Sequence, residues 1–135
     1  MSTSTTGFNE TAAIESITNV ISGGATVHLI GGGDSVLYTD GADEIDTKSD
    51  AEVSVDEADF TITTPTDFTG SATLENDNEL AFGSPSIGVV DDIIIQNDAN
   101  GDLFVVGDEP NDPDLTGEQV TLPASTTIYE LGNIE

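Results

Sequence analysis

Hydrophobic residues near the N-terminus follow a helical spacing. Five of them form one apolar stripe: Ala13, Ile14, Ile17, Val20 and Ile21. Because residues three and four apart share a face of an α-helix, the stripe predicts a helix over about residues 10–22. Asn9 is a suitable N-cap, Glu10 lies in the predicted first turn, and Gly23-Gly24 ends the pattern. The stripe needs a partner, and we expect it to contact either the domain core or an adjacent subunit.

After Gly24 the apolar residues alternate with polar ones, a spacing typical of β-strands. The first predicted strand covers residues 26–30 and ends at three consecutive glycines. Further short strands are predicted near residues 35–39, 53–55, 60–63, 72–74, 80–82, 120–122 and 126–131. Residues 40–59 are rich in acids, and we expect a loop there apart from the short strand at Val53 and Val55.

The strongest strand signal is a hairpin in the C-terminal half. Two apolar runs, at residues 89–96 and 102–106, are joined by a turn that contains Asn100-Gly101. Asn-Gly between apolar strands indicates a hairpin, because both residues accept the positive φ angles of a tight turn. The runs are apolar at consecutive positions, which predicts that both faces of the hairpin are covered.

These elements predict a mainly β fold: a β-sandwich or partly open barrel of short antiparallel strands with one N-terminal α-helix. We expect a single domain over residues 9–135, preceded by a mobile Ser/Thr-rich arm over residues 1–8. An acidic loop over residues 107–117 separates the hairpin from the last strands. A length of 135 residues suits one domain with a moderate core.

The charge of the chain is strongly one-sided. The sequence contains 27 Asp and Glu residues but only one Lys or Arg, Lys48, which gives a formal net charge of -26 at pH 7. A hydrophobic content of 36% separates the chain from a disordered acidic tail, so we expect the acids on the surface of a folded domain. Such a surface repels itself in dilute buffer, whereas at roughly 1 M salt the Debye length falls to about 3 Å. The composition therefore favours a protein that works in near-saturated salt, as proteins of halophiles do.

The same imbalance restricts the partners. Nucleic acids are bound mainly through Lys and Arg, and anionic membranes attract basic segments, so we expect neither as a partner. Loosely bound monovalent cations, K⁺ or Na⁺, are expected around the acidic surface.

The chain has no cysteine, no run of 18 apolar residues and no secretory signal after Met1. We therefore expect a chain made in the cytoplasm, with neither disulfides nor a membrane span.

Candidate metal sites in the sequence are weak. Asp98, Asn100 and Asp102 suggest a calcium loop, but an EF-hand with Gly101 at its sixth position needs Glu at its twelfth, where the chain has Gly107. A hairpin turn explains these residues better. Three acidic clusters could hold a hard cation through oxygen, although clusters arise by chance among 27 acids: Asp43-Glu44-Asp46, Asp56-Glu57-Asp59, and Asp108-Glu109 with Asp112 and Asp114.

Candidate catalytic residues are equally weak. His28, the only histidine, lies in a predicted strand, and a structural role explains it better than a general base or a metal ligand. The run Gly31-Gly32-Gly33-Asp34 is no dinucleotide fingerprint, because no helix is predicted after it. A carboxylate pair for glycoside hydrolysis is the alternative that the sequence leaves open. We expect a protein that is not an enzyme, with no catalytic residues, no defined metal site and no cofactor.

A longer pattern runs through the C-terminal half, in the order strand, turn, strand, loop, proline-containing segment and closing strand. Its parts are residues 88–95, 97–101, 102–107, 108–116, 117–124 and 126–131. This order, together with the N-terminal helix and its glycine turn, resembles that of small virion proteins of tailed phages and their archaeal relatives. Members of that group are found on capsids or tails. The chain departs from mesophilic members in lacking their aromatic and basic residues.

Combined with the acidic composition, the resemblance implies a structural protein of a tailed virus that infects a halophilic archaeon. It would assemble in multiple copies on the capsid surface as a turret, cement or decoration protein, with copies of itself and other virion proteins as partners. The alternatives are a tail component of the same virus type, or a cell-surface or adhesion module of a halophile. A possible assembly contact is the helix face formed by Ala13, Ile14, Ile17, Val20 and Ile21.

Overall fold

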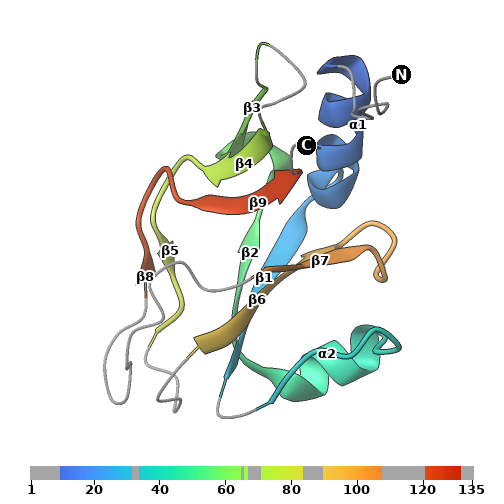
Figure 1. The fold of residues 1–135 in the computed structure, drawn as a ribbon. Coiled ribbons are helices and arrows are strands. Elements are labelled where there is room, and N and C mark those ends of the chain that lie inside the picture. The colour runs from blue at the N-terminus through green and yellow to red at the C-terminus, as the bar shows by residue number, and fades with distance from the viewer. Residues whose placement is uncertain are drawn as a thin grey trace, which may run out of the picture.

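The computed structural model describes residues 10–31, 34–64, 66, 71–83, 90–107 and 121–131 (Figure 1). In chain order its elements are α1 (Glu10–Ile21), β1 (Ala25–Gly31), α2 (Ala42–Lys48), β2 (Ser49–Val55), the 3₁₀ turn η1 (Glu57–Asp59), β3 (Phe60–Thr63), β4 (Ala72–Asn76), β5 (Leu80–Ala81), β6 (Val90–Asn97), β7 (Phe104–Gly107), β8 (Thr121–Leu122) and β9 (Thr127–Leu131). The predicted arm over residues 1–8 and nearly all of the predicted acidic loop lie outside the described residues.

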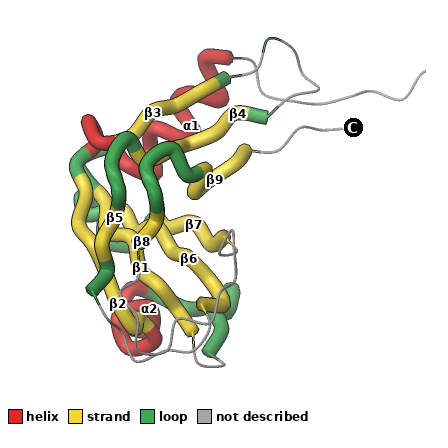
Figure 2. Tube along the Cα trace, turned by 90° about the vertical axis from the view of Figure 1, so that its left-hand side faces the viewer, coloured by secondary structure: helices red, strands yellow, loops and turns green. Residues whose placement is uncertain are grey.

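The described strands form three antiparallel sheets. The main sheet has the order β2-β1-β6-β7, a second has the order β3-β4-β9, and β5 pairs with β8. The two smaller sheets lie on one side of the main sheet, and α1 and α2 lie at opposite ends of the described molecule (Figures 1 and 2). The prediction of a mainly β, sandwich-like fold with an N-terminal helix is confirmed, and the described strands form no closed barrel.

Strand β1 is the centre of the main sheet and is buried on both faces. All seven of its residues are buried, and His28 is only 1% exposed. The alternation of apolar and polar residues at 26–30 predicts a strand with one solvent-exposed face. The structure differs from this prediction because both faces of the strand are buried. Because side chains alternate across a strand, a strand buried on both faces requires a separate apolar cover on each side of the sheet.

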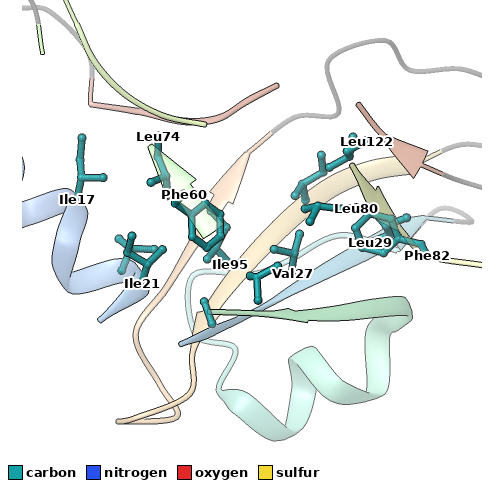
Figure 3. Packing of buried hydrophobic residues seen from close by; sticks show 14 of the residues in the cluster. Ile17, Ile21, Val27, Leu29, Phe60, Leu74, Leu80, Phe82, Ile95 and Leu122 are labelled. Atoms are coloured by element: carbon teal, nitrogen blue, oxygen red, sulfur yellow. The ribbon is translucent and has the colours of Figure 1, made fainter. Parts of the chain in front are cut away.

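The larger cover is the main core, which lies between the sheet and α1 with the two smaller sheets. Val27, Leu29 and Ile95 supply the floor of this core from β1 and β6 (Figure 3). Side chains of α1, β3 and β4 fill one end, whereas β5, β8 and Phe82 fill the other (Figure 3). The labelled members of these two groups are Ile17, Ile21, Phe60 and Leu74 at the first end, and Leu80, Phe82 and Leu122 at the second.

The smaller cover belongs to α2. Ile45 of α2 is fully buried against Ile30 and Ile94 of the main sheet, and the partly buried Val36 and Phe104 pack around them. Burial of a side chain such as Ile45 contributes about 1.5–3 kcal/mol of transfer free energy. This single contact therefore anchors α2 to the face of the sheet that carries His28.

Two local predictions from sequence were wrong in the segment before β2. We predicted one α-helix only, with a loop over residues 40–59 apart from the strand at Val53 and Val55, but residues 42–48 form α2. Its only buried side chain is Ile45, so no apolar stripe marks it in the sequence. We also predicted a strand at residues 35–39, but the structure has no strand there and a turn at Tyr38-Thr39.

One buried side chain joins α1 to the β6–β7 hairpin. The Asn97 amide nitrogen lies within hydrogen-bonding distance of three carbonyl oxygens at the end of α1: Asn19 at 3.0 Å, Val20 at 3.2 Å and Ser22 at 2.9 Å. The Asn97 amide oxygen accepts hydrogen bonds from the backbone N–H groups of Ala99 and Asn100. Helix ends leave carbonyl groups without partners, so Asn97 caps the helix and shapes the hairpin turn at once.

Asn76 joins two other loops in the same way. Its amide nitrogen donates to the carbonyl oxygens of Asn78 and Pro123, and its amide oxygen accepts from the N–H of Thr126. Its backbone carbonyl also accepts from the N–H of Ser125, the one described non-glycine residue with a positive φ, 63°. A buried amide therefore fixes the turn between β8 and β9 against the end of β4.

Replacing Asn97 is expected to destabilise the fold. Asn97→Ala removes the partners of buried carbonyl and N–H groups, and we expect a loss of about 3 kcal/mol in the free energy of unfolding. Asn97→Asp should cost more, because a carboxylate would face three carbonyl oxygens. Denaturant unfolding at molar salt measures both, with Asn19→Ala on the exposed side of α1 as the control. An Asn97→Ala chain as stable as this control would contradict the assigned role.

Candidate interaction site on the segment 34–48

The predicted assembly face on α1 is mostly used inside the chain. Ala13, Ile17, Val20 and Ile21 belong to the main core and are at most 4% exposed. Ile14 alone among the five stays outside, with 38% of its surface exposed. Four residues of the stripe therefore contact the domain core, and any contact of this face with a neighbour would centre on Ile14.

His28 lies in a closed hydrogen-bond network. Its Nδ1 is 2.8 Å from the Ser49 hydroxyl oxygen, and its Nε2 is 2.9 Å from the Gln96 amide oxygen. The Gln96 amide nitrogen donates to the carbonyl of Gly101 at 2.7 Å, so the Gln96 oxygen faces the imidazole and accepts from Nε2–H. Since both ring nitrogens have partners in a site that is 1% exposed, the arrangement ties β1 to β2 and to the hairpin.

Several of the residues singled out in the sequence as metal-ligand candidates have local structural partners. The Asp98 carboxylate accepts from the Thr26 hydroxyl at 2.8 Å, and the Asn100 side-chain oxygen accepts from two backbone N–H groups of the hairpin turn. The Asp59 carboxylate accepts from the backbone N–H of Asp56. Within the described residues no three His, Asp or Glu side chains are grouped so that they could hold a metal ion.

Two other candidates lie partly or wholly outside the described residues. The cluster of Asp108, Glu109, Asp112 and Asp114 falls in an undescribed part of the chain, as do Gly32 and Gly33. The N–H of Gly31 donates to the Asp50 carboxylate at 2.8 Å, and the N–H of Asp34 donates to the carbonyl of Gly31. The described ends of the glycine run thus form a connection between β1 and the following loop.

The most exposed apolar side chains lie together in the loop before α2. Among the described residues, the exposed large hydrophobic side chains are Ile14, Leu37 at 57% and Tyr38 at 104% exposure. Leu37 and Tyr38 are adjacent, and we call this pair the 37–38 tip. Single exposed apolar residues are common on protein surfaces, but an adjacent Leu-Tyr pair in a fixed loop is a candidate contact with another protein.

Lys48 fixes the loop that carries the 37–38 tip. Its ammonium group donates to the Asp40 carboxylate at 2.6 Å and to the carbonyl of Ser35 at 2.8 Å. The same carboxylate accepts from the N–H of Leu37 at 2.8 Å, and the N–H of Asp40 donates back to the carbonyl of Leu37. The only lysine of the chain is thus used to hold both sides of the tip.

The helix beside the tip carries a shallow depression. Gly41 precedes α2, and its N–H donates to the Glu44 carboxylate, which is one half of a capping box. The side chain of Ile45 points into the core, so the neighbouring positions of the helix face solvent. They line a depression of about 270 Å³, which we call the α2 depression and which is formed by Asp43, Glu44, Thr47 and Lys48.

Comparison with protein-family models, curated proteins and solved structures found no match for this chain. The described helices are too short and too polar to cross a membrane.

The Asp40–Lys48 pair makes the loop sensitive to acid. The hydrogen bond from Lys48, helped by the one from the Leu37 N–H, holds the pKa of Asp40 below its usual value. Since the folded-state pKa is lowered, the pair's contribution is complete above the ordinary Asp pKa of about 4 and is lost as pH falls through the folded value.

We therefore expect the stability difference between the wild type and Asp40→Asn to shrink as pH is lowered from about 6 towards 3. Urea unfolding at constant molar salt measures the difference at each pH. Asp46→Asn, an exposed position on α2, controls for the change in net charge. A difference that stays constant down to the lowest pH would contradict the role given to the ionised Asp40.

Proposed function

We propose that this protein is a non-enzymatic structural component of a tailed virus that infects a halophilic archaeon, and that it assembles in multiple copies on the capsid surface. The observation that carries the proposal is the order of elements from β6 to β9. A long strand, an Asn-Gly turn, a second strand, and two short strands around Pro123 follow one another as in the virion-protein pattern. The N-terminal helix with its glycine turn occupies the position that the same pattern gives it.

The charge supports a halophilic host. A net charge of -26 is carried by a chain whose single lysine already donates to Asp40 and Ser35. Neighbouring copies must therefore approach one another through surfaces that are acidic and have almost no cations of their own. At molar salt the Debye length is only a few ångströms, so the repulsion between neighbouring copies is screened. Many copies of such a chain can then pack side by side.

Mass spectrometry of purified particles, from the virus whose genome encodes the chain, tests the proposal. We expect the chain in a fixed ratio to the major capsid protein. Digestion should use a protease that cuts after Glu, because one lysine and no arginine leave trypsin a single internal site. Emptied capsids separated from tails serve as the control for location. Particles that lack the chain would overturn the proposal, and recovery only in cell-envelope fractions would favour an adhesion module.

Assembly and stability should both depend on salt. Lowering KCl from about 3 M to roughly 0.1 M lengthens the Debye length to about 10 Å, so carboxylates on one copy and between copies repel more strongly. We expect a lower melting temperature and looser assemblies at the lower salt, measured by calorimetry and light scattering. Assemblies that stay intact and melt at the same temperature after dialysis would count against a halophilic setting.

A further inference from the structure

We propose that Asn100 is a modification site whose side-chain amide is lost by attack of the Gly101 backbone nitrogen, and that the closed β6–β7 turn holds this reaction back until the turn opens. Asn100-Gly101 is the only Asn-Gly pair of the chain. The inference goes beyond the proposed function and does not rest on it, because the reaction involves only groups of one chain and water.

The reaction is a deamidation through a succinimide ring. The Gly101 backbone nitrogen gives up its proton and bonds to the side-chain carbonyl carbon of Asn100, and the amide nitrogen takes up a proton and leaves as ammonia. Water then opens the ring at one of its two carbonyl groups, which leaves aspartate or isoaspartate at position 100. One water is consumed, one ammonia is released, and the chain gains one carboxyl group.

The pair is accessible and sterically open. Asn100 is exposed, and a Cβ atom built on Gly101 would meet nothing within 4 Å. Glycine has no side chain to hinder the approach of its nitrogen, so this pair closes the ring more readily than an Asn before a larger residue. Water and base can therefore reach the two reacting groups, and what restrains them is the hydrogen bonding of the turn.

The closed turn occupies the attacking group. The Gly101 N–H donates to the Asn97 carbonyl at 3.0 Å, and the Gly101 carbonyl accepts from the Gln96 side chain at 2.7 Å. Ring closure requires this N–H to lose its proton and the nitrogen to approach the Asn100 side chain. Because both polar groups of Gly101 are held by β6, the nitrogen has to leave Asn97 before it can adopt a reactive orientation.

The same turn orients the group that is attacked. The Asn100 side-chain oxygen accepts from the N–H of Leu103 at 2.9 Å and from that of Asp102 at 3.3 Å. The Asn97 side-chain oxygen accepts from the Asn100 N–H at 3.1 Å, which fixes the backbone before the reacting pair. The rate of modification should therefore follow the fraction of time for which the turn is open, as amide hydrogen exchange does.

The chain's one Asp-Gly pair provides a contrast. Asp40 and Gly41 could form the same ring, but the Lys48 ammonium group holds the pKa of Asp40 below its usual value and keeps the carboxylate ionised. The Gly41 N–H also donates to the Glu44 carboxylate. An ionised carboxylate resists attack by a nucleophile, so the neutral amide of Asn100 is the reactive group of the two pairs.

The two products differ in their effect on the turn. Aspartate keeps a side-chain oxygen for the N–H groups of Asp102 and Leu103, so the turn can form again. Isoaspartate carries the main chain through the former side chain, which lengthens the backbone by one methylene and removes that acceptor. Asn97, which joins the turn to the end of α1, then faces an altered turn. A transient opening is thus converted into a permanent change.

Mass spectrometry of the full chain provides the first test. The chain is incubated in mildly alkaline buffer at molar KCl and, in parallel, unfolded in guanidinium chloride at the same pH. Cleavage after Glu gives a peptide of residues 80–118 that holds Asn97 and Asn100, and fragmentation locates the modified position. We expect position 100 to react in the unfolded chain and to react at least about tenfold more slowly in the folded chain. Asn97, followed by Asp98, is the internal control.

Two variants separate opening of the turn from unfolding of the whole chain. Asn97→Ala loosens the turn, whereas Leu74→Ala weakens the main core in β4. The two chains are compared at denaturant concentrations that give them equal global stability. We expect Asn97→Ala to lose the Asn100 amide several-fold faster than Leu74→Ala. A third variant, Asn100→Asp, should melt close to the wild type at molar salt, because it keeps the acceptor oxygen.

The contrary outcomes are distinct. An unfolded chain that stays unmodified at position 100 would overturn the site itself. Folded and unfolded chains that react at the same rate, or variants of equal stability that do so, would overturn the control by the turn. Neither result bears on the virion role, which the composition of purified particles tests.

Discussion

The structure depends on covering β1 from both sides. A central strand with seven buried residues cannot exist with one bare face, so the two helices and the two smaller sheets are arranged around that requirement. The cover on one side is a full core, whereas the other side relies on Ile45 with two neighbours and on the polar network of His28. Because the second cover is thin, α2 is held in place by few contacts, and the loop before it is positioned largely by the Lys48–Asp40 pair.

The elements that sequence reasoning predicted are those with a strong local signal. The α1 stripe and the Asn100-Gly101 signal each predict a structure within a few residues, and both the helix and the β6–β7 hairpin are present. The hairpin turn is wider than a tight Asn-Gly turn, because the last strand pair is Gln96 with Phe104 and Gly101 has a positive φ of 75° while Asn100 does not. α2 was missed because Ile45 is its only buried side chain, so its formation depends on the distant Ile94. The burial of Thr26 and His28 could not be predicted from the sequence either. Polar residues that alternate with apolar ones indicate a solvent-exposed face, and the hydrogen-bond partners that allow their burial come from distant parts of the chain.

The candidate site shows the same limit. Leu37 and Tyr38 stand in an alternating run that suits a strand, and nothing nearby in the sequence indicates that they are exposed. The loop that carries them is closed by the ion pair between Lys48 and Asp40, eight residues apart, which the sequence pattern does not reveal. The Ala13–Ile21 stripe presents the opposite case. Its pattern was visible, but only the packed structure shows that the core takes four of its five residues and leaves Ile14 outside.

The placement of Asn97 has a consequence for the order in which the chain becomes structured during synthesis. The helix α1 leaves the ribosome early, but the amide that caps its last carbonyls is made more than 70 residues later. The same delay applies to one edge of β1, which pairs with the distant β6, whereas its other edge pairs with the nearer β2. A nascent chain thus holds an uncapped helix and an apolar strand with one unpaired edge until the hairpin emerges, and contacts this distant are slow to form.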